Sequence, residues 1–194
     1  MTQTRAILVI AAATLCACAP KRDVELSNSK RLVSTPTGIA VLSSASDSAL
    51  LPAEISFGSS HGRSALYLEF PTDFAAYGVP LKAFIALSPR AEATPDATPV
   101  TVEAWRVNAA WQAEELRTWS DKPPLAPPYA SEEISSSPAR ELRIDVTELV
   151  RYAAQNPSLN FGFALLGRGG SGHGASFATG ISAGDAPRLE VYVR

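Results

Sequence analysis

The sequence from Trp111 to Pro123 reads W-Q-A-E-E-L-R-T-W-S-D-K-P, and this stretch does most to decide the fold. Three shorter runs follow it: R-I-D-V-T-E-L-V from Arg143, N-F-G-F-A-L-L from Asn160 and P-R-L-E-V-Y-V from Pro187. Their apolar and β-branched patterns predict, in order, a strand leading into a short helix, a second strand and a closing strand. We therefore expect a β-sandwich in which the tryptophan-rich stretch is a long loop folded over the sheets.

The rest of the chain after residue 36 is also patterned for strands. Apolar residues occupy every second position at 66–70, 142–146 and 191–193, which is typical of strands with one buried face. Short apolar and β-branched runs lie at 37–43, 53–58, 63–70, 80–88, 99–107, 141–146, 160–168, 175–179 and 188–193. Fifteen prolines and twelve glycines punctuate them. We expect an all-β protein, a single jelly-roll-like β-sandwich of about nine or more strands.

One short helix is predicted near 147–155. Asp145 and Thr147 are both residue types that cap helix starts, and Glu148 stands three residues after Asp145 in capping-box register. Apolar residues at 149, 150 and 153 give a helical stripe, which an Asn-Pro pair at 156–157 ends. We interpret Asp145 as a brace for the helix start rather than as a metal ligand or catalytic acid.

The first residues read as a targeting segment. Arg5 precedes a ten-residue apolar run at 6–15, which is too short to span a bilayer and is typical of a signal peptide. The run ends in Leu15-Cys16-Ala17-Cys18, which resembles the bacterial lipobox. The resemblance implies that residues 1–17 are a lipoprotein signal peptide and that Cys18 is lipidated. Lipidation at Cys16 and an ordinary secreted protein with two incidental cysteines remain as alternatives.

Composition limits the partners of the mature chain. Removal of residues 1–17 takes away Arg5 and no acid, which leaves 16 basic against 19 acidic side chains and a formal charge of −3. Such a chain has no bulk attraction for nucleic acid, and we expect none as a partner. Residues 18–36 are polar and charged and read as a lipid-anchored tether, so the acyl chains alone would provide membrane association. The folded domain is expected at 37–194, held without disulfides by its core.

The ordered motifs resemble a known family. Trp111, Glu114, Trp119 and Pro123 keep a fixed spacing, and the later motifs follow in the same order. The later positions are Asp145, Thr147, Asn160 and Gly162. Together they resemble the DNRLRE domain family, which is related to disaggregatase-associated domains and includes relatives classed as alginate-type carbohydrate-binding modules. The resemblance covers roughly 37–194 and implies a β-sandwich that binds polysaccharide.

Catalytic and metal sites find little support in the sequence. His61 and His173 lie in loops beside serines, but no G-x-S-x-G elbow accompanies them, so we do not expect an enzyme. No histidine, cysteine and aspartate spacing suits zinc, and we expect no metal or other cofactor. A structural calcium stays open without a motif behind it. The glycine-rich run 167–174 is interpreted as a hairpin turn that could fold over a ligand.

A glycan site needs exposed aromatic rings with polar groups around them. We interpret Trp111 and Trp119 as anchors of the long loop, with Glu114 or Glu115 bonding the loop backbone or an indole N–H. The candidate ligand residues are therefore Trp105, Arg106, Tyr67, Tyr129 and Arg63.

These expectations combine into one functional hypothesis. The protein is expected to be an outer-membrane lipoprotein of a Gram-negative bacterium, facing the periplasm or the cell surface, whose sandwich binds polysaccharide or cell-envelope glycan without catalysis. One alternative is a structural module of a surface or secretion apparatus that recruits an envelope protein through an exposed edge strand. The other is a polysaccharide-degrading enzyme.

Overall fold

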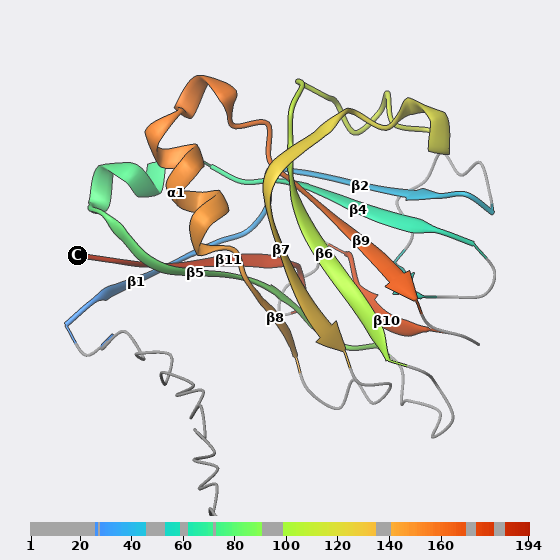
Figure 1. The fold of residues 1–194 in the computed structure, drawn as a ribbon, viewed down its shortest axis with the longest axis horizontal. Coiled ribbons are helices and arrows are strands. Elements are labelled where there is room, and N and C mark those ends of the chain that lie inside the picture. The colour runs from blue at the N-terminus through green and yellow to red at the C-terminus, as the bar shows by residue number, and fades with distance from the viewer. Residues whose placement is uncertain are drawn as a thin grey trace, which may run out of the picture.

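The computed structural model describes residues 26, 28–45, 53–58, 62–71, 73–90, 99–134, 141–169, 174–180 and 185–194. Within these ranges the chain forms eleven strands, one α-helix and three short 3₁₀ helices (Figure 1). All strand pairs are antiparallel. The prediction of an all-β sandwich is confirmed.

Two large sheets face each other. The first has the order β1-β11-β5-β8, with bounds Lys30–Ser34, Arg188–Val193, Pro80–Leu87 and Leu142–Asp145. The second has the order β2-β4-β9-β6-β7, with bounds Gly38–Ser43, Ser64–Glu69, Phe163–Gly169, Val100–Val107 and Leu125–Ile134. A separate pair joins β3 (Glu54–Phe57) to β10 (Ala175–Ala178).

The main core lies between the two large sheets. Alternate residues of β4, β6 and β9 meet alternate residues of β5, β8 and β11 there, as the period-two pattern requires. The β3–β10 pair adds aromatic side chains, including the tilted pair Phe57 and Phe177 at 6.0 Å between ring centroids. Burial of this apolar surface is the main favourable contribution to the stability of the fold.

A second, smaller core lies on the outer face of the five-stranded sheet. The segment 108–124 leaves β6, folds back over β2, β4 and β9, and returns as β7. It places Leu116, with Trp111 and Trp119, against the outward side chains of these strands. The expectation that this tryptophan-rich stretch folds over the sandwich matches what the structure describes.

The predicted helix is helix α1, Thr147–Gln155. It packs on β5 and β7, buries the apolar stripe at 149, 150 and 153, and sits where the edges of the two sheets approach each other (Figure 1). The 3₁₀ helices are η1 (Asp73–Tyr77), η2 (Trp119–Asp121) and η3 (Pro157–Leu159).

The tether predicted at 18–36 is corrected in its last part. Lys30–Ser34 is strand β1, which pairs with β11 along its whole length, so the folded domain begins before residue 37. Lys30, Arg31 and Val33 are exposed there because β1 is an edge strand, so its sequence lacks the pattern of a buried strand. The predicted signal peptide and Cys18 lie outside the described residues. No helix among the described residues has the length and apolar character needed to cross a bilayer.

Candidate functional site

One row of side chains crosses the outer face of the five-stranded sheet. Strand register places Ala40 beside Tyr67, Tyr67 beside Ala164, Ala164 beside Trp105, and Trp105 beside Tyr129. Registered partners in antiparallel strands point to the same face. The three aromatic residues predicted as ligand contacts therefore share a face, but their exposure differs.

Tyr67 is not available to a ligand, so the prediction that it contacts a ligand is wrong. It is fully buried, because the 108–124 segment covers it and the Trp111 ring packs on it edge-on at 5.9 Å. Burial raises the pKa of the Tyr67 phenol to about 12. Within the described part of the chain its hydroxyl has no hydrogen-bond partner.

Arg106 is also not on a ligand face. It is 7% exposed, and its guanidinium donates to the carbonyl of Pro127 at 3.1 and 3.3 Å and to Asn108 at 3.3 Å. It also lies over the ring of Tyr152, with the guanidinium carbon 4.2 Å from the centroid. Arg106 is in phase with the inward-facing Val102 and Ala104, because the register of β6 with β9 runs unbroken through this point. The register shift between Trp105 and Arg106 concerns only the pairing with β7. The ligand role predicted for Arg106 is therefore corrected to a structural one.

Trp105 and Tyr129 form an accessible aromatic pair. Their rings stack at 4.3 Å with an interplanar angle of 14°, and Tyr129 is 54% exposed. The Trp105 indole N–H donates to Glu103 Oε2 at 2.8 Å, while Glu103 Oε1 pairs with Arg168 Nε at 2.8 Å. Glu103 thus connects the aromatic pair to Arg168 on β9.

Arg168 lines a cleft of about 680 Å³. The cleft lies where β9 ends beside the start of β4 and the end of β2. The described residues that line it include three basic side chains, Arg63, Lys122 and Arg168, and the indole of Trp119, but no acidic side chain. The remaining lining residues are Ser44, Gly58, Gly62, Ser64, Leu166, Gly167 and Gly169.

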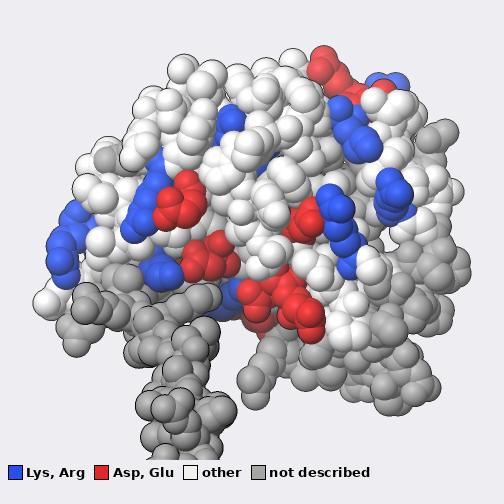
Figure 2. Space-filling model, viewed as in Figure 1, with Lys and Arg blue, Asp and Glu red and all other residues white. Residues whose placement is uncertain are grey.

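The cleft is positively charged and partly aromatic. Lys122 Nζ lies 4.0 Å from the centroid of the Trp119 ring, which holds the ammonium at the cleft. Of the three cations only Arg168 pairs with a carboxylate of the described residues. In Figure 2 blue side chains gather over the region where β9 ends, whereas red ones gather near the arrowhead of β7. Such a cleft favours a ligand with negative charge and an apolar ring face.

The signature residues hold the covering segment in place. Trp111 donates its indole N–H to the carbonyl of Phe161 at 2.7 Å, so neither Glu114 nor Glu115 is the partner that the sequence suggested. The carboxylate that ties the segment is Asp121, which accepts from the backbone N–H groups of Thr118 at 2.7 Å and Arg117 at 3.1 Å. These hydrogen bonds, first those from Thr118, lower the pKa of Asp121. Glu114 is exposed and Pro123 is buried.

Asn160 and Gly162 shape the turn into β9. Asn160 accepts the N–H of Gly162 at 3.3 Å, and Gly162 has φ of +86°. A side chain at Gly162 would place its Cβ 2.3 Å from the carbonyl oxygen of Leu68, so this position requires glycine. Both residues are structural, as the signature implied.

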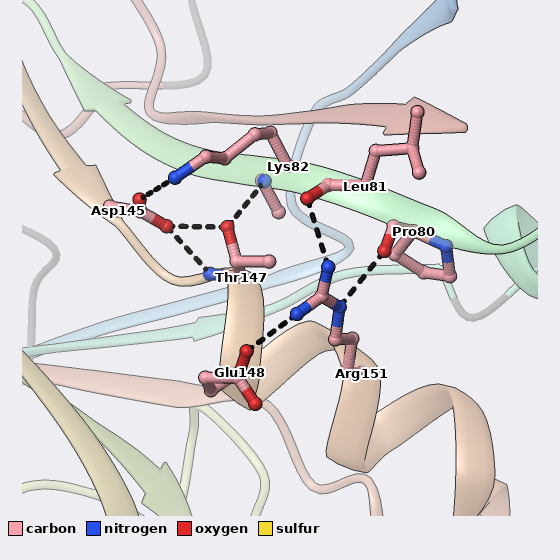
Figure 3. Close-up of polar contacts among 8 residues, drawn as sticks. Pro80, Leu81, Lys82, Asp145, Thr147, Glu148 and Arg151 are labelled. Carbon is pink, nitrogen blue, oxygen red and sulfur yellow. Dashed lines mark hydrogen bonds and ion pairs between the residues drawn. The ribbon is translucent and has the colours of Figure 1, made fainter. Parts of the chain in front are cut away.

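Asp145 and Thr147 form a polar network that fastens α1 to the four-stranded sheet (Figure 3). Thr147 accepts the N–H of Ala83 at 3.0 Å and donates to Asp145 at 2.5 Å, while Lys82 pairs with Asp145 at 2.8 Å. Burial alone would raise the pKa of Asp145, but the hydrogen bonds from Lys82 and Thr147 outweigh it and lower that pKa. Asp145 therefore braces the helix start.

Arg151 fastens the same helix from the next turn. Its guanidinium donates to the carbonyls of Pro80 at 3.0 Å and Leu81 at 3.1 Å and pairs with Glu148 at 2.7 Å (Figure 3). Every charged group in this network has a partner of opposite charge or a carbonyl. No group of three or more metal-ligating side chains occurs in the part of the chain that the structure describes.

Sequence reasoning missed two cleft residues. Lys122 and Arg168 were not among the candidates, and Trp119 was assigned only to the loop. The available signals were the Trp-x-x-Lys spacing at 119–122 and the arginine in the glycine-rich run. The hairpin turn predicted at 167–174 is corrected in its first part, because residues 167–169 belong to strand β9, where they line the cleft. Residues 170–173, with His173, lie outside the described residues, as does His61. A scan against models of known families and a search of curated proteins found no match to this chain.

Proposed function

We propose that this protein is a non-catalytic glycan-binding module, displayed on the cell envelope by a lipidated N-terminus, and that it binds an acidic polysaccharide. The cleft of Arg63, Trp119, Lys122 and Arg168 is the observation that carries the proposal. We further propose that the chain is a diverged relative of the DNRLRE domain family, on the strength of the ordered signature from Trp111 to Gly162.

The cleft has the chemistry that an acidic sugar needs. Arginine and lysine form charge-assisted hydrogen bonds with carboxylate or sulfate groups, and an indole can stack on the apolar face of a sugar ring. Its volume of about 680 Å³ lies within the range of ordinary small-ligand sites. An uncharged glycan would leave Arg63 and Lys122 without a new partner, and we therefore expect it to bind more weakly.

The aromatic pair extends this surface beyond the cleft. Glu103 bonds both Trp105 and Arg168, so the strip from Tyr129 to Arg168 is continuous on one face. A polymer could place one charged unit in the cleft and another against the half-exposed rings. A strip of this kind suits a chain ligand better than a free monosaccharide.

Affinity electrophoresis through gels that contain different polysaccharides tests the proposal. We expect a polyuronate or a sulfated galactan to retard the protein, and a neutral glucan to leave its mobility unchanged. Arg63→Gln should weaken the retardation, because Arg63 is an exposed cleft residue. Arg117→Gln is the matched control, since Arg117 is exposed but does not line the cleft. Equal retardation by neutral and acidic gels would contradict the proposal.

A further inference from the structure

One end of the sandwich gathers the start of β1, the end of β11 and the start of β5. Lys30 pairs with Val193, which pairs with Pro80, and the backbones of Val79 and Arg194 exchange hydrogen bonds at 3.0 and 3.3 Å. Residues 73–77, the helix η1, lead directly into this corner. We call this corner the tether end, because the chain enters the fold here immediately before Lys30 (Figure 1).

The tether end exposes apolar side chains. Val79 is 67% exposed, Val33 52% and Tyr77 51%, and these are three of the four large hydrophobic residues of the described chain that are more than half exposed. Val33 and Tyr77 also line one groove of about 290 Å³ between β1 and η1. Isolated exposed apolar residues are ordinary, but a cluster at one end indicates a contact surface.

Basic groups surround these apolar residues. Lys30 Nζ lies 4.6 Å from the centroid of the Tyr77 ring, and Arg194 is exposed beside Val79. Asp73 lines the same groove and offsets part of this positive charge. Tyrosine and lysine together are typical of the membrane–water interface, where a ring sits at headgroup level and an ammonium reaches the phosphates.

We infer that the tether end docks on the lipid surface that holds the N-terminus. Only eleven residues separate Cys18 from Lys30, so with a lipid at Cys18 this end stays within about 40 Å of the bilayer. A short tether keeps the domain at a high effective concentration near the bilayer. A small patch with weak intrinsic affinity for lipid is therefore enough for docking. The inference rests on an N-terminal anchor and extends the proposed function, because it assigns a second surface to the molecule.

Docking at this end sets the orientation of the glycan cleft. The cleft lies at the other end of the long axis, where β2 and β9 end (Figure 1). The tether end also carries the leftmost blue side chains of Figure 2, far from the blue group near the end of β9. A docked molecule therefore presents Arg63, Lys122 and Trp119 away from the membrane, toward a polymer in the surrounding medium.

In the test, a histidine tag holds the N-terminus on lipid vesicles, so the result does not depend on lipidation of the protein. Residues 18–194 with six histidines in front are bound to vesicles of phosphatidylcholine, phosphatidylglycerol and a nickel-chelating lipid. A polarity-sensitive fluorophore is attached at Val79→Cys, or at Ser120→Cys on the cleft side, with Cys18→Ser in both. Nitroxide-labelled lipid then reports how close each position lies to the bilayer.

If the tether end docks, nitroxide-labelled lipid should quench the fluorophore at position 79 at least about twice as strongly as the fluorophore at position 120. Adding Tyr77→Ser should remove most of this difference, whereas Leu159→Ser, which removes an exposed apolar residue of η3, should leave it unchanged. Equal quenching at both positions, or a difference that survives Tyr77→Ser, would overturn the inference. Neither result bears on glycan binding, which is measured separately without vesicles.

Discussion

Glu190 is the residue that organises the outer face of the four-stranded sheet. Its side chain is only 2% exposed, yet it accepts from Arg31 and Arg143, each at 2.6 Å, and from Arg188 at 3.2 Å. Burial alone would raise the pKa of Glu190, but the arginines outweigh this effect and hold that pKa below its usual value. One carboxylate thus ties together β1, β8 and β11.

This arrangement predicts acid sensitivity. Because the pKa of Glu190 is lower in the folded state than in the unfolded state, the unfolded chain binds the proton first as the pH falls. The stabilisation is therefore complete above roughly pH 5 and is lost as the pH falls through the folded pKa. Denaturant unfolding of the native chain and of Glu190→Gln, from neutral pH downward, measures it.

We expect Glu190→Gln to lower the free energy of unfolding at neutral pH by about 2 kcal/mol. That is less than for a fully buried ion pair, because the Arg31 and Arg143 side chains are 50% and 42% exposed. The difference between the two proteins should shrink toward acid pH. A constant difference would mean that the charge of Glu190 contributes nothing.

The ligand residues show what sequence can establish at the scale of single residues. Alternation within a strand could not show that Tyr67 and Trp105 share a face, because this depends on the strand order that puts them in one row of the sheet. It could not show that segment 108–124 folds over Tyr67, because that contact depends on tertiary packing. Alternation along β6 puts Arg106 on the face opposite to Trp105, where it is buried, so the ligand role proposed for both residues was inconsistent with one strand. Arg63 and Tyr129 are exposed, as a ligand contact must be.

At the scale of elements, α1 was predictable and β1 was not. The helix carries its capping residue types and apolar stripe in local sequence, so its bounds agree with the prediction. Strand β1 has a charged sequence on an edge, and it forms because β11 provides a partner far along the chain. Local patterns contain no signal for such a partner.

We expect the attachment of helix α1 to the sheet to depend strongly on Thr147, although the Thr147 side chain is small. Thr147→Val keeps the shape but leaves the backbone N–H of Ala83 without its side-chain acceptor and removes one of the donors to Asp145. We expect the free energy of unfolding to fall by about 1–3 kcal/mol, with the loss of an internal hydrogen bond as its cause. Chemical denaturation measures this value.

Thr101→Val serves as the control, because Thr101 lies on β6 in the outer-facing register of Glu103 and Trp105. It should change stability by less than about 0.5 kcal/mol. Equal effects of the two substitutions would show that the network in Figure 3 does not fasten the helix.

At the scale of the whole molecule, the sandwich separates two surfaces along its longest axis. The basic cleft lies where β2 and β9 end, and the apolar, basic tether end lies where β1 begins (Figure 1). The strand patterns predicted the sandwich, because the alternation of buried and exposed residues can be recognised in short stretches of sequence. The cleft was not predictable, since Arg63, Lys122 and Arg168 come from three separate segments that only the fold brings together.

The most direct test of the proposed glycan cleft is a calorimetric titration with a uronate oligosaccharide. The double variant Arg63→Gln/Lys122→Gln removes two of the cleft cations, and Arg117→Gln/Lys30→Gln removes the same two residue types outside the cleft. We predict that the first variant binds at least about tenfold more weakly than the native chain and that the second binds within about twofold of it. Equal affinities for all three proteins, each folded by circular dichroism, would contradict the account.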